Sequence, residues 1–155
     1  MKAIGILFVA LALFQCSCHS LVRHNPERAS VSDSKAIIEE VYSYMVTNAA
    51  TDLEYVRFVE LQPDEVERLR ERCGNQFSIF GTNKMEYISD QEDYHLHGSK
   101  RTGSLISVGV ANMRRRSAEA YGSYLHPGSV ANFRYRLVKE KGRWRILSSD
   151  FESAS

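Results

Sequence analysis

The sequence contains no apolar run long enough to cross a membrane and no pair of cysteines within its main part. The longest apolar run covers residues 3–14, which is twelve residues, whereas a membrane-spanning helix needs about 20. Of three cysteines, only Cys73 lies beyond residue 20, so no internal disulfide framework is available and the core must hold by packing. We expect Cys73 to be a small buried hydrophobic residue rather than a reactive thiol.

The chain carries almost no net charge, and it lacks the common cofactor-binding motifs. The formal net charge is +1, and no nucleic-acid reader motif occurs, which argues against a nucleic-acid partner. The chain has neither a phosphate-binding glycine loop nor a nucleophile elbow. We therefore expect no cofactor.

Charge is nevertheless divided between the two halves of the chain. Residues 19–99 carry eight Lys and Arg against fifteen Asp and Glu, whereas residues 100–155 carry eleven against four. Two halves of opposite net charge can neutralise each other within one folded domain, which is the interpretation we favour. The alternative is an acidic partner for the basic half.

The first twenty residues have the features of an export signal. Lys2 supplies a charged start, residues 3–14 form a short apolar middle, and small residues follow. We predict an export signal over residues 1–20 and a mature protein that works outside the cytosol.

Two cysteines close this signal, and a cysteine directly after the apolar run resembles a bacterial lipoprotein signal. The resemblance implies lipidation of Cys16 or Cys18, with Gln15 and Ser17 as the preceding residues. The alternative is cleavage near residues 18–20, which would release the domain. Membrane contact is thus expected only through a lipid anchor, and the protein is either anchored in the cell envelope or secreted.

The remaining residues fit one domain. Residues 21–32 are polar and predict a short tether, and residues 33–155 predict a single folded domain. Ser32, Asp33 or Ser34 can cap a first helix. Its apolar side chains recur at three-to-four spacing and predict one buried stripe, formed by Ile37, Ile38, Val41, Tyr42, Met45, Val46 and Ala49.

A second helix and a run of strands follow. Residues 55–61 favour a strand, although the spacing of Glu54, Arg57 and Glu60 leaves a helix as the alternative. Pro63 opens a short helix that Gly74 ends. The periodicity then changes to two, and we predict α+β architecture, with helices on one face of a mainly antiparallel sheet. The predicted strands cover residues 77–80, 84–89, 104–112, 118–125, 130–139 and 143–149.

The last hairpin carries the clearest pattern. With residues 139–142 as its connection, Tyr135 and Leu137 lie opposite Ile146 and Trp144 on one face. Four arginines project from the other face and form a candidate partner-binding surface, here called the arginine face: Arg134, Arg136, Arg143 and Arg145.

This hairpin resembles the end of the nuclear transport factor 2-like superfamily, in which an alternating strand leads into Lys-x-x-Gly and then Arg-Trp-Arg-Ile. The matching residues are 133–146, with 118–121 as the preceding strand, and the resemblance covers most of residues 33–149. It implies a cone in which N-terminal helices pack on a curved sheet. Lipocalin-like and cystatin-like sheets are the alternatives. The superfamily includes isomerases, dehydratases, secretion-system subunits and non-catalytic binders, so the fold does not fix the function.

An isomerase or dehydratase would need a base and a hydroxyl inside the cone. We expect packed or solvated side chains at each candidate rather than a catalytic set. The candidates for the hydroxyl are Tyr42, Tyr44, Tyr121 and Tyr124, and those for the base are His126, Asp90 and Glu119.

His95 and His97 stand near Asp90, Glu92 and Asp93, a spacing that allows a metal site. Further ligands are not indicated, so we expect a solvated acidic loop and no metal. Three arginines occupy residues 114–116. We expect a solvated hairpin tip there, and an anion site is the alternative.

The sequence as a whole predicts an exported, non-enzymatic domain that binds a protein partner or a small ligand of unspecified identity. Two alternatives stay open. One is a small-molecule isomerase or dehydratase with a pocket between the first helix and the sheet, and the other is a subunit of an envelope or secretion assembly. The sequence does not specify an oligomeric state.

Overall fold

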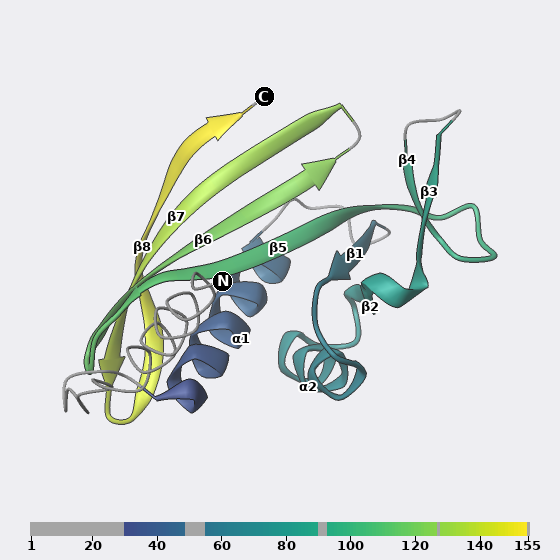
Figure 1. Cartoon of the computed structure of the whole chain (residues 1–155). Coiled ribbons are helices and arrows are strands. Elements are labelled where there is room, and N and C mark those ends of the chain that lie inside the picture. The colour runs from purple at the N-terminus through teal and green to yellow at the C-terminus, as the bar shows by residue number, and fades with distance from the viewer. Residues whose placement is uncertain (1–29, 49–54, 90–92, 127, 155) are drawn as a thin grey trace, which may run out of the picture.

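The computed structural model describes residues 30–48, 55–89, 93–126 and 128–154. These residues form an α+β fold with two α-helices and a large, curved, mostly antiparallel sheet (Figure 1), which confirms the predicted class. Cys16 and Cys18 lie outside the described residues. The elements are α1 (Val31–Asn48), β1 (Val56–Val59), α2 (Pro63–Cys73), β2 (Ser78–Gly81), the 3-10 turn η1 (Thr82–Lys84), β3 (Met85–Ile88), β4 (Asp93–Leu96), β5 (Thr102–Met113), β6 (Ser117–His126), β7 (Ser129–Glu140) and β8 (Arg143–Ala154).

Helix α1 begins at Val31, earlier than predicted, because Ser30 caps it. The Asp33 backbone N–H donates to the Ser30 hydroxyl at 3.2 Å, and the Ser30 backbone N–H donates to the Asp33 carboxylate at 3.1 Å. This reciprocal capping box satisfies N–H groups that a helix start otherwise leaves unpaired. A tether reaching residue 32 and a cap at Ser32, Asp33 or Ser34 are therefore wrong.

The apolar stripe of α1 is confirmed as core. Ile38 is only partly buried, and Ala49 lies outside the described residues. The buried members are Ile37, Val41, Tyr42, Met45 and Val46.

The segment after α1 forms a β1–α2–β2 unit. Helix α2 begins at Pro63, and the backbone N–H of the preceding Gln62 donates to the Glu65 carboxylate at 3.0 Å. The helix ends before Gly74, whose φ of 96° suits glycine. The strand, the helix and both helix ends match the sequence predictions. Because a helix connects β1 and β2, the two strands can run parallel.

The sheet has the strand order β2-β1-β5-β6-β7-β8. Strands β5 to β8 pair antiparallel, as predicted, but β1 pairs parallel with both β2 and β5. The sequence also missed β4, which pairs with β3 and with β5 where an acidic loop was expected. Residues 114–116 do form the connection between β5 and β6, as predicted.

The final hairpin has a tighter turn and a shifted register compared with the prediction. Lys141 and Gly142 alone connect β7 and β8, and both have positive φ, 48° and 83°, as favoured two-residue hairpin turns require. This two-residue turn places Lys139 opposite Trp144 and Leu137 opposite Ile146. A register shift between Arg136 and Leu137 then places Tyr135 opposite Ser149. The predicted pairings of Tyr135 with Ile146 and Leu137 with Trp144 are therefore wrong, although all four side chains belong to the core or pack against it.

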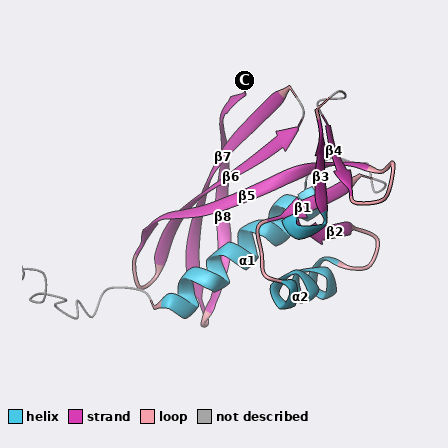
Figure 2. Ribbon diagram, turned by 45° about the vertical axis from the view of Figure 1, so that its right-hand side comes forward, coloured by secondary structure: helices cyan, strands magenta, loops and turns pink. Residues whose placement is uncertain are grey.

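Helix α1 packs against one face of the sheet, called here the inner face, while α2 lies beside β1 and β2 (Figure 2). Gly122 in β6 permits the close approach of α1. A Cβ at this position would lie 2.4 Å from the Met45 sulfur and 2.9 Å from a ring carbon of Tyr135. The helix and the inner face are thus in direct contact at the middle of β6.

Within the described residues, no helix has both the length and the apolar character needed to span a membrane.

Candidate functional site

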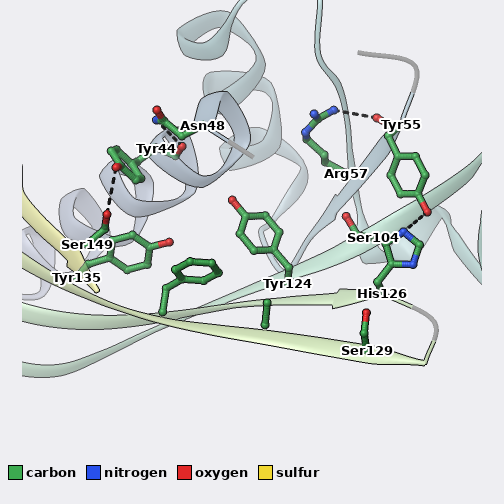
Figure 3. A pocket seen from close by; sticks show the side chains of 12 residues that line it. Tyr44, Asn48, Tyr55, Arg57, Ser104, Tyr124, His126, Ser129, Tyr135 and Ser149 are labelled. Carbon is green, nitrogen blue, oxygen red and sulfur yellow. Dashed lines mark hydrogen bonds between the residues drawn. The ribbon is translucent and has the colours of Figure 1, made fainter. Parts of the chain in front are cut away.

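A cavity of about 700 Å3 opens between the C-terminal half of α1 and the inner face of the sheet (Figure 3). It lies beyond the contact at Gly122, toward the His126 end of β6 and the Ser129 end of β7. This volume suits a small organic molecule. The lining side chains are Tyr44, Asn48, Tyr55, Arg57, Ser104, Tyr124, His126, Ser129, Ala131, Phe133, Tyr135 and Ser149.

Side chains alternate between the two faces along each strand, and this alternation directs the pocket residues of β6 and β7 to the inner face. Ala131, Phe133 and Tyr135 are alternate residues of β7 and point to the inner face, as do Tyr124 and His126 of β6. Helix α1 supplies Tyr44 and Asn48, four residues apart on one side of the helix. The pocket is therefore formed by residues that the periodicity of each element brings to one side.

Aromatic rings form one end of the pocket. The Tyr124 and Phe133 ring centres are 5.7 Å apart at 90°, and those of Tyr44 and Tyr135 are 5.8 Å apart at 72°. Edge-to-face pairs of this kind are favourable and hold each ring in one orientation. Phe151, which does not itself line the pocket, packs edge-on against Phe133 with ring centres 5.5 Å apart and is 60% exposed. This end offers a preformed apolar surface.

The hydroxyl groups at the aromatic end are neutral donors. The Tyr124 hydroxyl donates to the Met45 carbonyl oxygen at 2.5 Å, and the Tyr44 and Ser149 hydroxyls lie 3.2 Å apart. Burial raises the pKa of Tyr124 and of Tyr135 above the usual tyrosine value. These phenols therefore stay protonated at neutral pH and add no negative charge to the pocket.

The opposite end of the pocket is polar. Tyr55 and Arg57 come from β1, Ser104 from β5 and His126 from β6, and Figure 3 shows them grouped away from the Tyr44 and Tyr135 end. The Tyr55 hydroxyl and His126 Nε2 are hydrogen-bonded, with ring centres 5.1 Å apart. This contact joins β1 to the end of β6 at the edge of the pocket.

Arg57 contributes a buried guanidinium to the described lining of the pocket. It is only 4% exposed, its Nη1 donates to the Tyr55 carbonyl oxygen at 2.9 Å, and its guanidinium carbon lies 5.2 Å from the centre of the Phe77 ring. These contacts orient the guanidinium from two sides. A buried cation that borders a cavity is a costly feature unless it has polar contacts.

Three of the side chains that the sequence offered for catalysis line the pocket: Tyr44, Tyr124 and His126. The other candidates that the structure describes lie elsewhere. Tyr42 is buried in the core, where burial raises its pKa to about 12. Tyr121 and Glu119 project from the outer face, where Arg134 lies over the Tyr121 ring and the Asn112 amide donates to Glu119 at 3.0 Å. Asp90 lies outside the described residues.

Tyr55, Arg57 and Ser104 were missed by the sequence reasoning. The available signal in the sequence was Arg57 itself, a charged residue within the apolar run at residues 55–59. In the structure all four residues of β1 are buried. Charged side chains are rarely fully buried without a specific role or partner. What the sequence did not show is that β1 joins β5 in parallel, which carries Arg57 and Ser104 to the same end of the pocket.

The role of the arginine face in partner binding stays a prediction. The structure shows which acidic side chains lie near its arginines. Arg134 and Arg136 alternate with pocket residues of β7 and therefore lie on the outer face. Arg134 forms an ion pair with Glu152 at 2.5 Å, and Arg136 lies 3.7 Å from Asp150. Arg143 and Arg145 are exposed. Half of the arginine face is thus matched by acidic neighbours of the same hairpin.

His95 and His97 do not form a metal cluster with other described residues. His95 is buried, with Nε2 3.9 Å from an Asp93 oxygen, whereas His97 is exposed and lies 3.3 Å from Glu86. No group of three or more ligating side chains occurs among the residues described; Asp90 and Glu92 are not among them. Cys73 is buried, as expected, and burial raises the pKa of its thiol.

No protein-family model matches the sequence, and no curated protein and no solved structure matches it.

Proposed function

We propose that the chain is an exported domain that binds a small organic ligand in the pocket between α1 and the sheet. The observation that carries this proposal is the cavity of about 700 Å3, which has aromatic walls at one end and a few convergent polar groups at the other. Binding sites for small molecules usually combine a concave apolar surface with a small number of placed polar groups. The export signal at residues 1–20 would deliver this function outside the cytosol.

We also propose that the fold is the nuclear transport factor 2-like cone. Two of the features that support this assignment are a long first helix and a curved sheet that ends in two long hairpin-connected strands (Figure 1). The third is the pocket between the helix and the sheet (Figure 3). The fold would explain why the pocket is built on rigid elements. It does not distinguish a binding protein from an enzyme.

Filling the pocket should abolish ligand binding. Ala131 lines the cavity, and an Ala131→Trp side chain would occupy much of it. The probe is N-phenyl-1-naphthylamine, an uncharged aromatic dye whose fluorescence rises in apolar sites. We expect saturable binding at one site in the unmodified protein and an affinity at least about tenfold lower in Ala131→Trp, since the two occupants compete for one volume.

The matched control is the same substitution at Ala111, which is exposed on β5. Ala111→Trp should bind the dye like the unmodified protein. Equal binding by Ala131→Trp and Ala111→Trp, with both variants folded by circular dichroism, would contradict binding in this pocket.

One observation favours a second candidate, an isomerase or dehydratase: the hydrogen-bonded Tyr55 and His126 at the pocket edge. Imidazole is suited to general base catalysis near neutral pH. A ligand extracted from the pocket would be incubated with fresh protein and followed by mass spectrometry and NMR. Conversion that falls at least about a hundredfold in His126→Gln would establish the enzyme. If the protein does not convert the ligand, the enzyme hypothesis is contradicted and the proposed binding function remains.

A further inference from the structure

We infer that the Tyr135 hydroxyl donates a hydrogen bond to the ligand, and that the pocket selects a flat, ring-containing compound whose carbonyl-type oxygen reaches the aromatic end. This inference rests on the proposed ligand-binding function and adds the chemical class of the ligand. It follows from how the hydroxyl groups at the aromatic end are paired.

Tyr135 brings a polar atom deep into the cavity. Its side chain is only 2% exposed and lines the pocket. Figure 3 shows the Tyr135 hydroxyl pointing away from Ser149 and toward the side of the cavity where Tyr124 lies. Within the part of the chain that the structure describes, this hydroxyl has no hydrogen-bonding partner.

The other hydroxyls at the aromatic end do have partners. The Tyr124 hydroxyl donates to the Met45 carbonyl oxygen, and the Tyr44 and Ser149 hydroxyls lie 3.2 Å apart. Buried polar groups in folded proteins are nearly always hydrogen-bonded, so a buried hydroxyl without a protein partner calls for an explanation. A ligand atom that pairs with Tyr135 provides one.

The missing partner is an acceptor. Burial raises the pKa of Tyr135, and the nearby Tyr44 acts in the same direction, so the phenol keeps its proton at neutral pH. A protonated phenol has one hydrogen to donate. A ligand N–H group could pair with the phenol oxygen, but it would leave this hydrogen unpaired. A carbonyl oxygen satisfies the hydrogen directly.

Packing fixes the position of this donor. The Tyr44 and Tyr135 rings meet nearly edge-on, with centres 5.8 Å apart at 72°. On the β6 side, Gly122 lies so close that a Cβ there would be 2.9 Å from a Tyr135 ring carbon. A donor that is held in place before the ligand arrives loses little conformational freedom on binding.

The surface beside the hydroxyl suits a flat ligand body. The Phe133 and Tyr135 rings are nearly parallel, with 28° between their planes and centres 6.4 Å apart. Ala131 follows on the same face of β7, and its small side chain leaves room beside Phe133. A ring of the ligand can pack on this surface while its carbonyl oxygen accepts from Tyr135.

A ligand without an acceptor should bind less tightly. An apolar compound at the aromatic end would exclude water from the Tyr135 hydroxyl without replacing the lost hydrogen bond, which opposes binding. Sites with buried hydrogen-bonding groups therefore discriminate against analogues that lack the matching atom.

Two naphthalene compounds that differ only at the carbonyl group test this inference: 6-propionyl-2-(dimethylamino)naphthalene and its 6-propyl analogue, both uncharged at neutral pH. Their affinities for the full-length protein are measured by displacement of N-phenyl-1-naphthylamine. We expect the unmodified protein to bind the ketone about tenfold more tightly. In Tyr135→Phe this preference should fall to about twofold or less. The bound ketone should also emit at shorter wavelength, because its carbonyl oxygen loses a hydrogen bond.

The matched control is the same substitution at Tyr121, which lies on the outer face beneath Arg134. Tyr121→Phe should keep the full preference for the ketone. Tyr135→Phe should unfold at a urea concentration no lower than the unmodified protein, because the hydroxyl that it removes has no described partner. A lower urea midpoint with an unchanged preference would assign this hydroxyl to the stability of the fold and overturn the inference.

The outcomes separate this inference from the proposed function. If the ketone binds the unmodified protein no more tightly than its analogue, while Ala131→Trp abolishes binding of the dye, the pocket binds ligands but the inference is wrong. If the preference persists in Tyr135→Phe, another group is the donor and the inference is also wrong. If binding of neither compound nor of the dye depends on Ala131, the proposed function itself fails.

Discussion

Replacing Gly103 by alanine should lower the free energy of unfolding by about 3 kcal/mol, at the upper end of the cost of overpacking. Gly103 lies at a junction in the sheet, where it is the register partner of Val56 in β1 and of Tyr94 in β4. A Cβ at this position would lie 2.3 Å from the Val56 carbonyl oxygen and 2.8 Å from a Phe58 ring carbon. Because the nearest atom belongs to the backbone, β1 or β5 must move. Urea unfolding followed by circular dichroism measures the loss.

The same strand provides the control. Gly109 also lies in β5, but a Cβ there would have no atom within 4 Å. We expect Gly109→Ala to change the free energy of unfolding by no more than about 0.5 kcal/mol. Equal urea midpoints for the two variants would show that β1 and β5 do not approach as closely as the structure places them.

Replacing Asp33 by alanine should cost about 3 kcal/mol of unfolding free energy, the upper range for loss of hydrogen bonds to a charged group. The Asp33 carboxylate accepts hydrogen bonds from Lys139 Nζ and, at 3.0 Å, from Trp144 Nε1. Its other oxygen accepts from the Ser30 backbone N–H. The substitution removes the helix cap and leaves the N–H of Trp144, a residue only 5% exposed, without its acceptor.

The effect of Asp33 should depend on pH. The hydrogen bond from Lys139 is the largest influence and holds the pKa of Asp33 well below 3.8, with Trp144 and Ser30 acting in the same direction and burial opposing them. A carboxyl with a lowered folded-state pKa stabilises the protein above its unfolded-state pKa and loses that contribution as the pH falls below it. The stability difference between the unmodified protein and Asp33→Ala should therefore be constant above about pH 5 and shrink below pH 3.8.

Asp150 provides a comparison for this second result. Its side chain is 53% exposed and 3.7 Å from Arg136, so Asp150→Ala should change the free energy of unfolding by less than about 0.5 kcal/mol. A loss in Asp33→Ala no greater than that in Asp150→Ala would contradict the role of Asp33 in joining α1 to the last hairpin.

Most secondary structure could be predicted because it depends on neighbours in the sequence. The apolar stripe of α1, the Pro63 and Gly74 ends of α2 and the alternation of the long strands are local patterns. The start of α1 was placed too late, because several residues before Lys35 can cap a helix and only the reciprocal bonds between Ser30 and Asp33 select one.

The candidate site was only partly predictable. Tyr44, Tyr124 and His126 were named as candidates from their residue types, and they do line the pocket. Arg57 and Ser104 were not, because they are 47 positions apart in the sequence and meet only through the parallel pairing of β1 with β5. The register shift between Arg136 and Leu137 was likewise not predicted, because the alternation within each strand does not specify where an irregularity interrupts the pairing of two strands.

The sequence by itself determined the α+β class, the amphipathic first helix and the sequence of long strands, because hydrophobic periodicity and turn residues act over a few positions. Tertiary structure alone decided that β1 runs parallel within the sheet, that the last hairpin is shifted, and that an aromatic wall and Arg57 border one cavity. The reason is physical: pairing partners and cavities arise from contacts between residues distant in the chain. Their free energies depend on close packing in three dimensions, as the contacts at Gly103 and Gly122 illustrate.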